Sequence, residues 1–191
     1  ETSVISLLEE FQAREGIKLN EEQRLAVHIA HTNKISLITG SAGVGKTTVL
    51  KALYEVFDHA GIQVYQVALA GRAAKRMHEA THRPASTLAT FLRKVNASEL
   101  ERSVVVVDEA SMIDIITFYR LCEKMPDSTQ LVLVGDPSQL MPVGPGLVLH
   151  VLEQIEGIPK VQLKVVKRYQ GALQVAAVSI REGNWPELSR N

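Results

Sequence analysis

One glycine-rich segment, Gly40 to Thr47, constrains the fold more than any other part of this sequence. It follows a short apolar run at residues 35–39 and precedes a long amphipathic stretch. The chain is therefore expected to pass from a strand through a tight loop into a helix. Glycines in such a loop let backbone amides point inward at phosphate oxygens. The eight residues match the P-loop pattern, which predicts a site for the phosphates of ATP or GTP.

The polar residues of this loop have expected roles. Lys46 reaches the β and γ phosphates as a point charge, and the Thr47 hydroxyl takes one coordination position on Mg²⁺. The helix that begins near Gly45 adds its positive end. A glycine-rich turn without a ligand is the alternative, but the flanking strand and helix favour nucleotide binding. The residues predicted here to hold the nucleotide are Gly40, Ser41, Ala42, Gly43, Val44, Gly45, Lys46, Thr47 and Thr48.

Short apolar, β-branched runs alternate with longer amphipathic stretches, which predicts an α/β fold with a mainly parallel sheet covered by helices on both faces. The run Val104 to Val107 is apolar throughout, as expected for a central strand between two helical layers. Two short helices are expected before the sheet, at residues 4–13 and 21–30. The expected strands are residues 35–39, 62–68, 104–107, 131–134 and 161–165, and the later helices are residues 45–60, 72–79, 113–124 and 173–181.

The composition excludes several classes of protein. With 191 residues, 46% hydrophobic and 22% charged, the chain suits one compact domain and is too apolar for intrinsic disorder. No apolar run approaches the roughly 20 residues of a membrane span, so no membrane partner is expected. The single Cys122 has no internal disulfide partner, and no Cys and His cluster has zinc-ligand spacing. We expect a reducing, cytoplasmic location. Because the sequence starts without Met, we also expect a piece of a longer protein.

The charges balance over the whole chain but not locally. Lys and Arg together number 21, as do Asp and Glu, so a polyanion must be held by a local patch. Between Gly71 and Lys94 the chain has six basic residues and a single acid, Glu79. These six residues, called the basic patch below, are Arg72, Lys75, Arg76, Arg83, Arg93 and Lys94.

Two adjacent acids, Asp108 and Glu109, follow the apolar run 104–107. This position is the carboxyl end of a parallel strand, the edge at which α/β sheets bind ligands. Asp108 is expected to hold Mg²⁺, directly or through water, and Glu109 to polarise the water that attacks the γ-phosphate. The alternative is two solvated acids that cap the next helix. A catalytic acid directly after the metal ligand favours hydrolysis over transfer to an acceptor.

A third segment, Gly135 to Leu140, follows the expected strand 131–134. At the same sheet edge, Gln139 is placed to reach the γ-phosphate and report its presence. A plain turn explains the segment equally well, because Gly, Asp, Pro and Ser are ordinary turn residues. Guanine specificity finds no support, since the Asn33-Lys34 pair precedes the P-loop and lacks the Asp of a guanine-reading motif.

Taken together, Gly40 to Thr48, Asp108 to Met112 and Gly135 to Gly144 resemble motifs I, II and III of superfamily 1B DNA helicases, and most closely those of the RecD-like branch. Residues 17–183 follow the family's motifs in order. The resemblance implies a RecA-like P-loop NTPase fold, ATP and Mg²⁺ as cofactors, and a motor that moves 5′ to 3′ on single-stranded DNA.

Two nucleotide contacts are assigned by this resemblance alone. Residues 19–23 look like the family's Q motif, in which Gln23 would read the adenine edge. Asn20 and Gln23 also form a capping box that opens an ordinary helix, and the two roles are compatible. Residues 163–169 resemble motif IV, whose Arg168 would reach the γ-phosphate as an arginine finger. A surface Arg in a basic stretch is the alternative for Arg168.

The DNA contacts are likewise assigned by resemblance, to motif Ia. Arg72, Ser86 and Thr87 would contact the DNA backbone and fix its register without reading bases, and a solvated basic helix face is the alternative. Leu69-Ala70 stand where the family usually has Pro-Thr, and Ala89 where it has His. Two polar DNA contacts are therefore absent, and weaker DNA binding is expected.

Other departures concern the motor as a whole. Met141 stands where Pro is usual and Tyr169 where Gln is common, and neither change removes a catalytic group. Residues 93–103 are too few for the β-hairpin pin that RecD-like enzymes use to part the duplex. No segment resembles motifs V and VI, so a second RecA-like lobe in the same parent chain is the expected partner.

The resulting hypothesis divides the chain into N-terminal helices (1–34), a RecA-like ATPase lobe (35–165) and a motif IV-like segment leading to the second lobe (166–191). Alone, this lobe is expected to hydrolyse ATP poorly, because catalysis needs charges from both lobes. The alternative is a vestigial lobe that binds DNA or protein within a larger enzyme such as a relaxase. An ATP-dependent kinase or ring-forming ATPase finds no support in the segment after residue 134.

Overall fold

A computed structural model describes residues 3–164 of the chain. Its helices are α1 (Val4–Glu15), α2 (Glu21–Thr32), α3 (Lys46–His59), α4 (Gly71–Thr81), α5 (Leu88–Lys94), α6 (Ile115–Lys124) and α7 (Val148–Gln154). Its strands are β1 (Ile35–Gly40), β2 (Gln63–Ala68), β3 (Ala85–Thr87), β4 (Ser103–Asp108), β5 (Gln130–Gly135) and β6 (Lys160–Leu163). Short 3-10 turns cover Ala97–Leu100 and Ala110–Met112.

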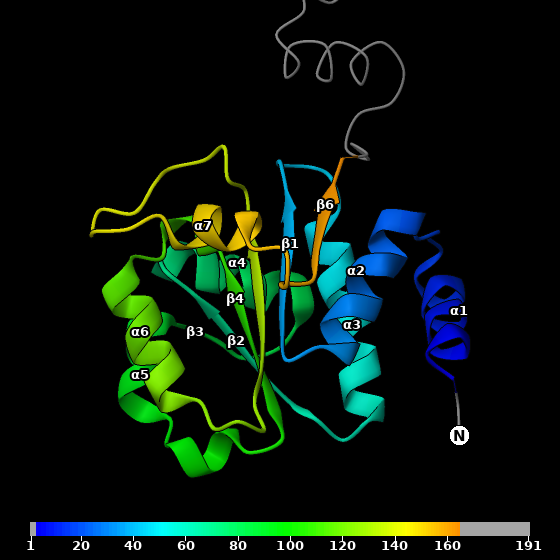
Figure 1. Cartoon of the computed structure of the whole chain (residues 1–191). Helices are drawn as coiled ribbons and strands as arrows, with labels where there is room; N and C mark the ends of the chain where they lie inside the picture. Colours follow the sequence, from blue (N-terminus) through cyan, green and yellow to red (C-terminus); the bar gives the residue numbers. More distant parts are fainter. Residues whose placement is uncertain (1–2, 165–191) are drawn as a thin grey trace, which may run out of the picture.

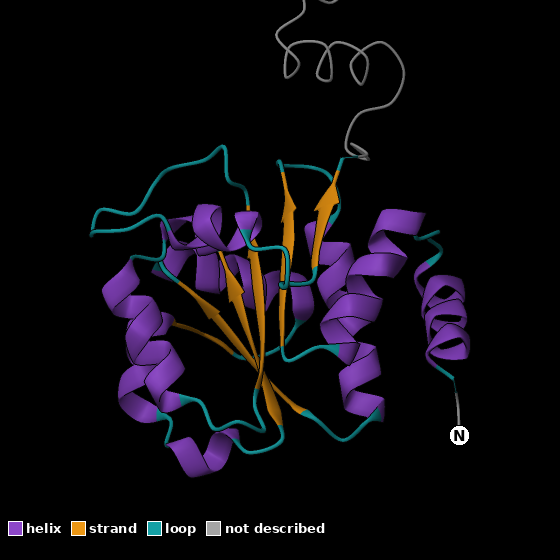
Figure 2. Ribbon diagram, viewed as in Figure 1, coloured by secondary structure: helices purple, strands orange, loops and turns teal. Residues whose placement is uncertain are grey.

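The six strands form one parallel sheet in the order β3-β2-β4-β5-β1-β6. Figure 2 shows the strands running the same way, so that their carboxyl ends meet at a single edge. The strand β4 lies between β2 and β5, with Val106 paired to Gln66 on one side and to Val132 on the other. The prediction of a central, doubly covered strand is therefore confirmed.

Two helical layers cover the sheet (Figure 1). Val104 and Val106 pack into a core with α1–α4, whereas Val105 and Val107 pack into a second core with α5–α7. Successive strand residues point to opposite faces, so both faces of β4 are buried. The predicted fold class, an α/β sheet with helices on both faces, is confirmed.

The expected elements that fall within the described residues match those of the structure within a few residues. The helix expected at residues 113–124 begins only at Ile115, because the Asp114 carboxylate accepts the N–H of Thr117 at 2.7 Å and caps the helix there. The strand β3 and the helices α5 and α7 were not predicted. The expected helix 173–181 lies outside the described residues.

The segment between α5 and β4 contains the 3-10 turn Ala97–Leu100 and no β-hairpin, in this described part of the chain. Among residues 3–164, no helix has the length and apolar character to cross a membrane.

Candidate nucleotide-binding site

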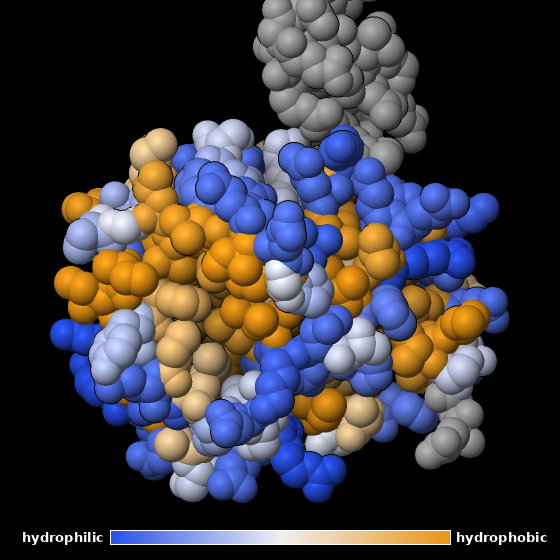
Figure 3. Space-filling model, in the orientation of Figure 1, coloured by the Kyte–Doolittle hydropathy of each residue, from blue (hydrophilic) through white to orange (hydrophobic). Residues whose placement is uncertain are grey.

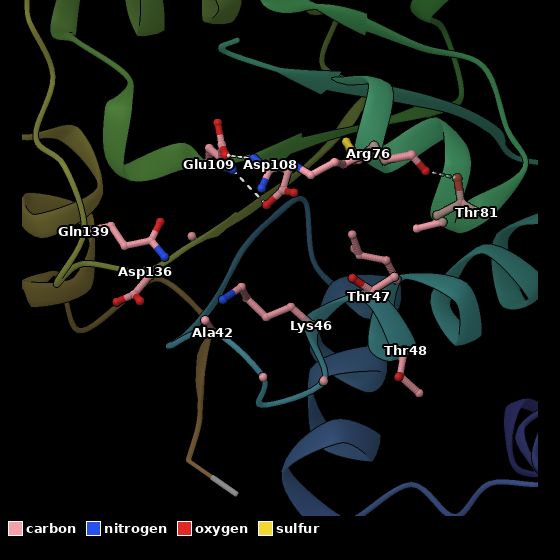
Figure 4. Close-up of a pocket in the computed structure, with 16 residues that line it drawn as sticks. Ala42, Lys46, Thr47, Thr48, Arg76, Thr81, Asp108, Glu109, Asp136 and Gln139 are labelled. Atoms are coloured by element: carbon pink, nitrogen blue, oxygen red, sulfur yellow. Dashed lines mark hydrogen bonds and ion pairs between the residues drawn. The ribbon is translucent and has the colours of Figure 1, made fainter. Parts of the chain in front are cut away.

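A cavity of 510 Å³ opens at the carboxyl edge of the sheet, between the glycine-rich loop, α4 and the ends of β4 and β5. The loop enters from one side and the acidic strand ends from another, so segments nearly one hundred residues apart in sequence share this space (Figure 4). The lining side chains and glycines are Ala42, Gly43, Gly45, Lys46, Thr47, Thr48, Leu50, Arg76, Met77, Ala80, Thr81, Asp108, Glu109, Gly135, Asp136 and Gln139.

The loop backbone requires glycine at two positions. Gly45 has φ +91°, in the left-handed region, and a Cβ there would lie 2.3 Å from Gln23 Nε2. At Gly40, a Cβ would lie 2.7 Å from Val44 Cγ2 and 2.8 Å from the carbonyl oxygen of Leu163. The loop is thus packed against α2 on one side and β6 on the other. Its shape comes from the surrounding fold as well as from its own sequence.

Lys46 is the first residue of α3 and lies in the cavity. Its Nζ donates to the carbonyl oxygen of Ser41 at 3.0 Å and to that of Gly40. Burial lowers the pKa of this ammonium, and the nearby carboxylates of Asp136 and Asp108 oppose that shift. Figure 4 shows the side chain extended over the loop toward the side on which Asp136 lies. The cation is therefore held over the space that the loop encloses.

Asp108 ends β4 and faces the same cavity. Burial raises the pKa of its carboxyl group, while a hydrogen bond from the Glu109 amide and the charges of Lys46 and Arg76 work in the opposite direction. The amide N of Glu109 donates to Asp108 Oδ1 at 2.8 Å. Asp108 and Thr47 place a carboxylate and a hydroxyl in one cavity, and such oxygen ligands suit Mg²⁺.

Glu109 follows in a left-handed backbone conformation, with φ 56°. Its Oε1 lies 2.8 Å from Arg76 Nη2 of α4, and the Glu109 side chain is 23% exposed. Sequence reasoning placed Arg76 only in the basic patch. No sequence signal pairs these residues, because the contact depends on how α4 lies against the end of β4.

The turn after β5 supplies Asp136 and Gln139. The buried Asp136 carboxylate accepts two hydrogen bonds from Ser138, one from its backbone N–H at 3.0 Å and one from its hydroxyl at 2.6 Å. The backbone N–H of Gln139 donates to the Asp136 carbonyl oxygen at 3.0 Å. This bonding folds the turn so that Gln139 lines the cavity. Asp136 was not predicted as a site residue, although its place after a parallel strand was a usable signal.

Gln23 lies beside the cavity but does not line it. Its Oε1 accepts the backbone N–H of Asn20 at 3.1 Å, and its own backbone N–H donates to Asn20 Oδ1 at 2.8 Å. The capping box is therefore present. The side chain is fully buried, and its Nε2 has no hydrogen-bond partner among the described residues. The structural role of Gln23 is thus visible, and its adenine contact stays a prediction.

The residues predicted to contact DNA lie in two elements, the helix α4 and the strand β3. Arg72 is exposed on α4, whereas Ser86 and Thr87 are partly buried in the edge strand β3. The Thr87 hydroxyl accepts the N–H of Thr90 at 3.2 Å and caps α5, so this residue has a structural role. The basic patch is also divided, since Arg83 pairs with Asp58 and not with the site. Arg168 lies outside the described residues.

Comparison with known proteins gives a consistent result. The family described as AAA domain matches residues 18–190. The RecBCD enzyme subunit RecD of Mycolicibacterium smegmatis is 34% identical over 200 residues, which cover 86% of this chain and 36% of that protein. The ATP-dependent RecD2 DNA helicase of Deinococcus radiodurans is 33% identical over 164 residues, covering 82% of this chain and 22% of that protein.

Two further similarities extend this result. A probable conjugal transfer protein TraA of Sinorhizobium fredii is 30% identical over 172 residues, covering 87% of this chain and 16% of that protein. The crystal structure of Pif1 helicase from Candida albicans superposes with a TM-score of 0.62 and 24% identity, covering 90% of this chain and 46% of that one. This chain therefore spans between 16% and 36% of the length of these three sequence relatives.

Proposed function

Because this chain belongs to the AAA domain family, we propose that it is the ATP-binding and hydrolysing lobe of a RecD-like helicase that moves 5′ to 3′ on single-stranded DNA. The resemblance to RecD-like proteins is borne out by sequence relatives at 33% and 34% identity. One observation carries the proposal further: Lys46, the adjacent pair Asp108 and Glu109, and Gln139, from three separate segments, line a single cavity.

In this proposal the loop binds the triphosphate of ATP. The amides of Ala42 to Gly45 and the amino end of α3 face the phosphates, and Lys46 exchanges its contacts with the loop carbonyls for the β and γ phosphates. Gln139 lies across the cavity, where it meets the γ-phosphate. Gln23 and Arg168 are proposed to contact the adenine and the γ-phosphate, respectively.

Thr47 and Asp108 are the residues that would hold Mg²⁺. Both line the cavity, and Mg²⁺ at nucleotide sites is usually held by one or two protein ligands together with the phosphates. When bound, Mg²⁺ would neutralise the charge that develops on the phosphate oxygens. Glu109 would take the proton of the attacking water while that water bonds to the γ-phosphorus and the bond to the β-phosphate oxygen breaks.

The wider assembly is part of the same proposal. Arg72, Ser86 and Thr87 contact the DNA backbone, a second RecA-like lobe closes over the nucleotide, and the protein works in the cytoplasm. The division at residues 34 and 165 belongs to this proposal as well. Weak hydrolysis by the isolated chain is expected, because one missing arginine finger lowers the rate about 10³-fold or more.

The test is Glu109→Gln in the full-length protein that contains this chain. Removal of the proton acceptor is expected to lower DNA-stimulated ATP turnover by about 10²- to 10⁴-fold while the affinity for ATP, measured by calorimetry, is kept. Glu101→Gln, at an exposed position before β4, is the matched control and leaves turnover unchanged. Equal turnover of wild type and Glu109→Gln would support the vestigial binding module instead.

A further inference from the structure

An ion pair joins the acidic edge of the sheet to α4, the helix that carries three of the six residues of the basic patch. Arg76 Nη2 lies 2.8 Å from Glu109 Oε1. The Arg76 side chain is 71% exposed and that of Glu109 only 23%. The guanidinium thus has one side on the proposed catalytic carboxylate and the other in solvent, where a second anion can reach it.

The backbone fixes where Glu109 can point. Its left-handed φ of 56° places it at a sharp turn, and the Met112 amide donates to the Glu109 carbonyl oxygen at 3.0 Å. The next residues, Ala110 and Ser111, are buried. A change in its own side-chain torsions is therefore enough to reorient the carboxylate. Within residues 3–164, Arg76 is the one side chain that bonds to it.

Arg76 also shares a helix face with the proposed DNA contact Arg72. Residues four apart on a helix are neighbours, with Cβ atoms about 5–6 Å apart. Lys75, on a different face, pairs with Glu79 at 3.8 Å and is 77% exposed. A phosphate bound at Arg72 therefore lies beside Arg76, and a guanidinium binds phosphate and carboxylate with the same fork of N–H donors.

We infer that Arg76 is a positioning residue that holds Glu109 in the DNA-free lobe and releases it when a phosphate of single-stranded DNA takes over the guanidinium. This inference rests on the proposed function. While paired, Glu109 has Oε1 bonded to the Arg76 guanidinium on the α4 wall of the cavity, so this oxygen is not free to bond a water. Once released, the carboxylate is free to orient the attacking water. One arginine would thus couple DNA binding to hydrolysis, with no change in the fold.

The exposure of Arg76 limits the size of this effect. Ion pairs that reach solvent are weak, because water screens them and two side chains must be ordered. The pair is therefore expected to lower ATP turnover in the absence of DNA by only about two- to fivefold. Any larger stimulation by DNA must come from other parts of the motor.

The experiment compares the full-length wild type with Arg76→Gln, measuring ATP turnover with and without oligo-dT. In the variant, kcat without DNA is expected to rise about two- to fivefold at unchanged KM for ATP, while kcat at saturating DNA stays the same. The stimulation factor then falls by the same amount. The slope of log affinity for DNA against log salt is expected to decrease by about 0.7, as for one lost phosphate contact on a single strand.

Two further variants separate this role from a general loss of charge. Arg14→Gln removes an exposed ion pair of similar length, 2.7 Å to Glu55, between residues that do not line the cavity, and is expected to leave DNA-free turnover unchanged. Arg76→Lys keeps a cation and is expected to keep DNA-free turnover low. A fall of kcat in Arg76→Gln both with and without DNA would overturn the inference, because Arg76 would then assist catalysis directly.

Failure of the inference can be told apart from failure of the proposed function. A wild type stimulated by DNA, together with unchanged DNA-free turnover in Arg76→Gln, overturns the inference alone. A wild type whose turnover does not respond to DNA overturns the motor proposal and the inference together.

Discussion

The two helical layers differ in how completely they cover their apolar side chains. In the first layer, α1–α4, Phe11, Tyr54 and Phe57 are at most 2% exposed. In the second layer, which includes the loop after β5, Tyr119 is 60% exposed and Val143 is fully exposed. Figure 3 shows apolar residues gathered where Figure 1 places α7 and this loop.

The difference follows what each layer carries. The first layer holds the phosphate loop, and α2 closes against that loop where Gln23 meets Gly45. The second layer carries the turn with Gln139, which is exposed and is proposed to meet the γ-phosphate. Close packing thus characterises the layer that carries the phosphate loop, and exposed apolar side chains characterise the layer that carries the turn with Gln139.

The largest expected loss of stability comes from a substitution in the first layer. Phe57→Ala removes a fully buried ring and is expected to lower the free energy of unfolding by about 3–5 kcal/mol, measured by denaturant titration. Tyr119→Ala, in the second layer, removes an exposed side chain whose hydroxyl donates to Glu123 Oε1 at 2.7 Å. It is expected to lower the free energy of unfolding by less than about 1 kcal/mol. Similar costs for the two would mean that the layers do not differ in packing.

A smaller effect is expected where the first layer meets the loop. Gly45→Ala places a methyl group against Gln23 and forces a non-glycine residue to φ +91°. We expect a loss of about 1–3 kcal/mol in unfolding free energy, together with weaker ATP binding by calorimetry. Gly157→Ala has open space around its Cβ and is expected to change stability by less than about 0.5 kcal/mol. Equal unfolding free energies for the two variants would mean that Gly45 is not tightly packed against Gln23.

The smallest expected effect is a pH dependence from the first layer. Burial, and then the charge of His28, lower the pKa of His31, whose ring packs edge-on to Phe57 at 6.1 Å. The unfolded chain therefore binds the proton more readily, so stability is kept above about pH 6.5 and falls as the pH drops below it. The ring is partly exposed, so the loss stays below about 1 kcal/mol. His31→Gln should reduce this loss between pH 7.5 and 5.5 in denaturant titrations, and an identical pH dependence would contradict the burial argument.

The sequence predicted the elements whose pattern is local. The strand at Val104 to Val107 is recognisable because every residue is apolar, and the loop at Gly40 to Thr47 because its glycines stand at fixed positions. The strand β3 was missed because its three residues, Ala-Ser-Thr, carry no apolar pattern. The helices α5 and α7 have only seven residues each, too few to show a clear helical period.

In the site, the residues that directly follow a strand could also be predicted from the sequence. The positions of Asp108, Glu109 and Gln139 follow from the rule that ligands bind at the carboxyl ends of parallel strands. The ion pair between Arg76 and Glu109 was not predictable, because residues 33 positions apart meet only through the packing of α4 on the sheet. The burial of Gln23 against Gly45 likewise depends on where α2 packs.

The common direction of all six strands sorts the connections of this lobe into two sets. Those that leave β1, β4 and β5 line the cavity, and changes in their length would disturb it. Those that enter the strands, such as the turns at Gly61, Asp127 and Gly157, lie at the opposite edge. Insertions, labels or fused domains at these turns would leave the chemistry untouched, so this end of the lobe is free to diversify.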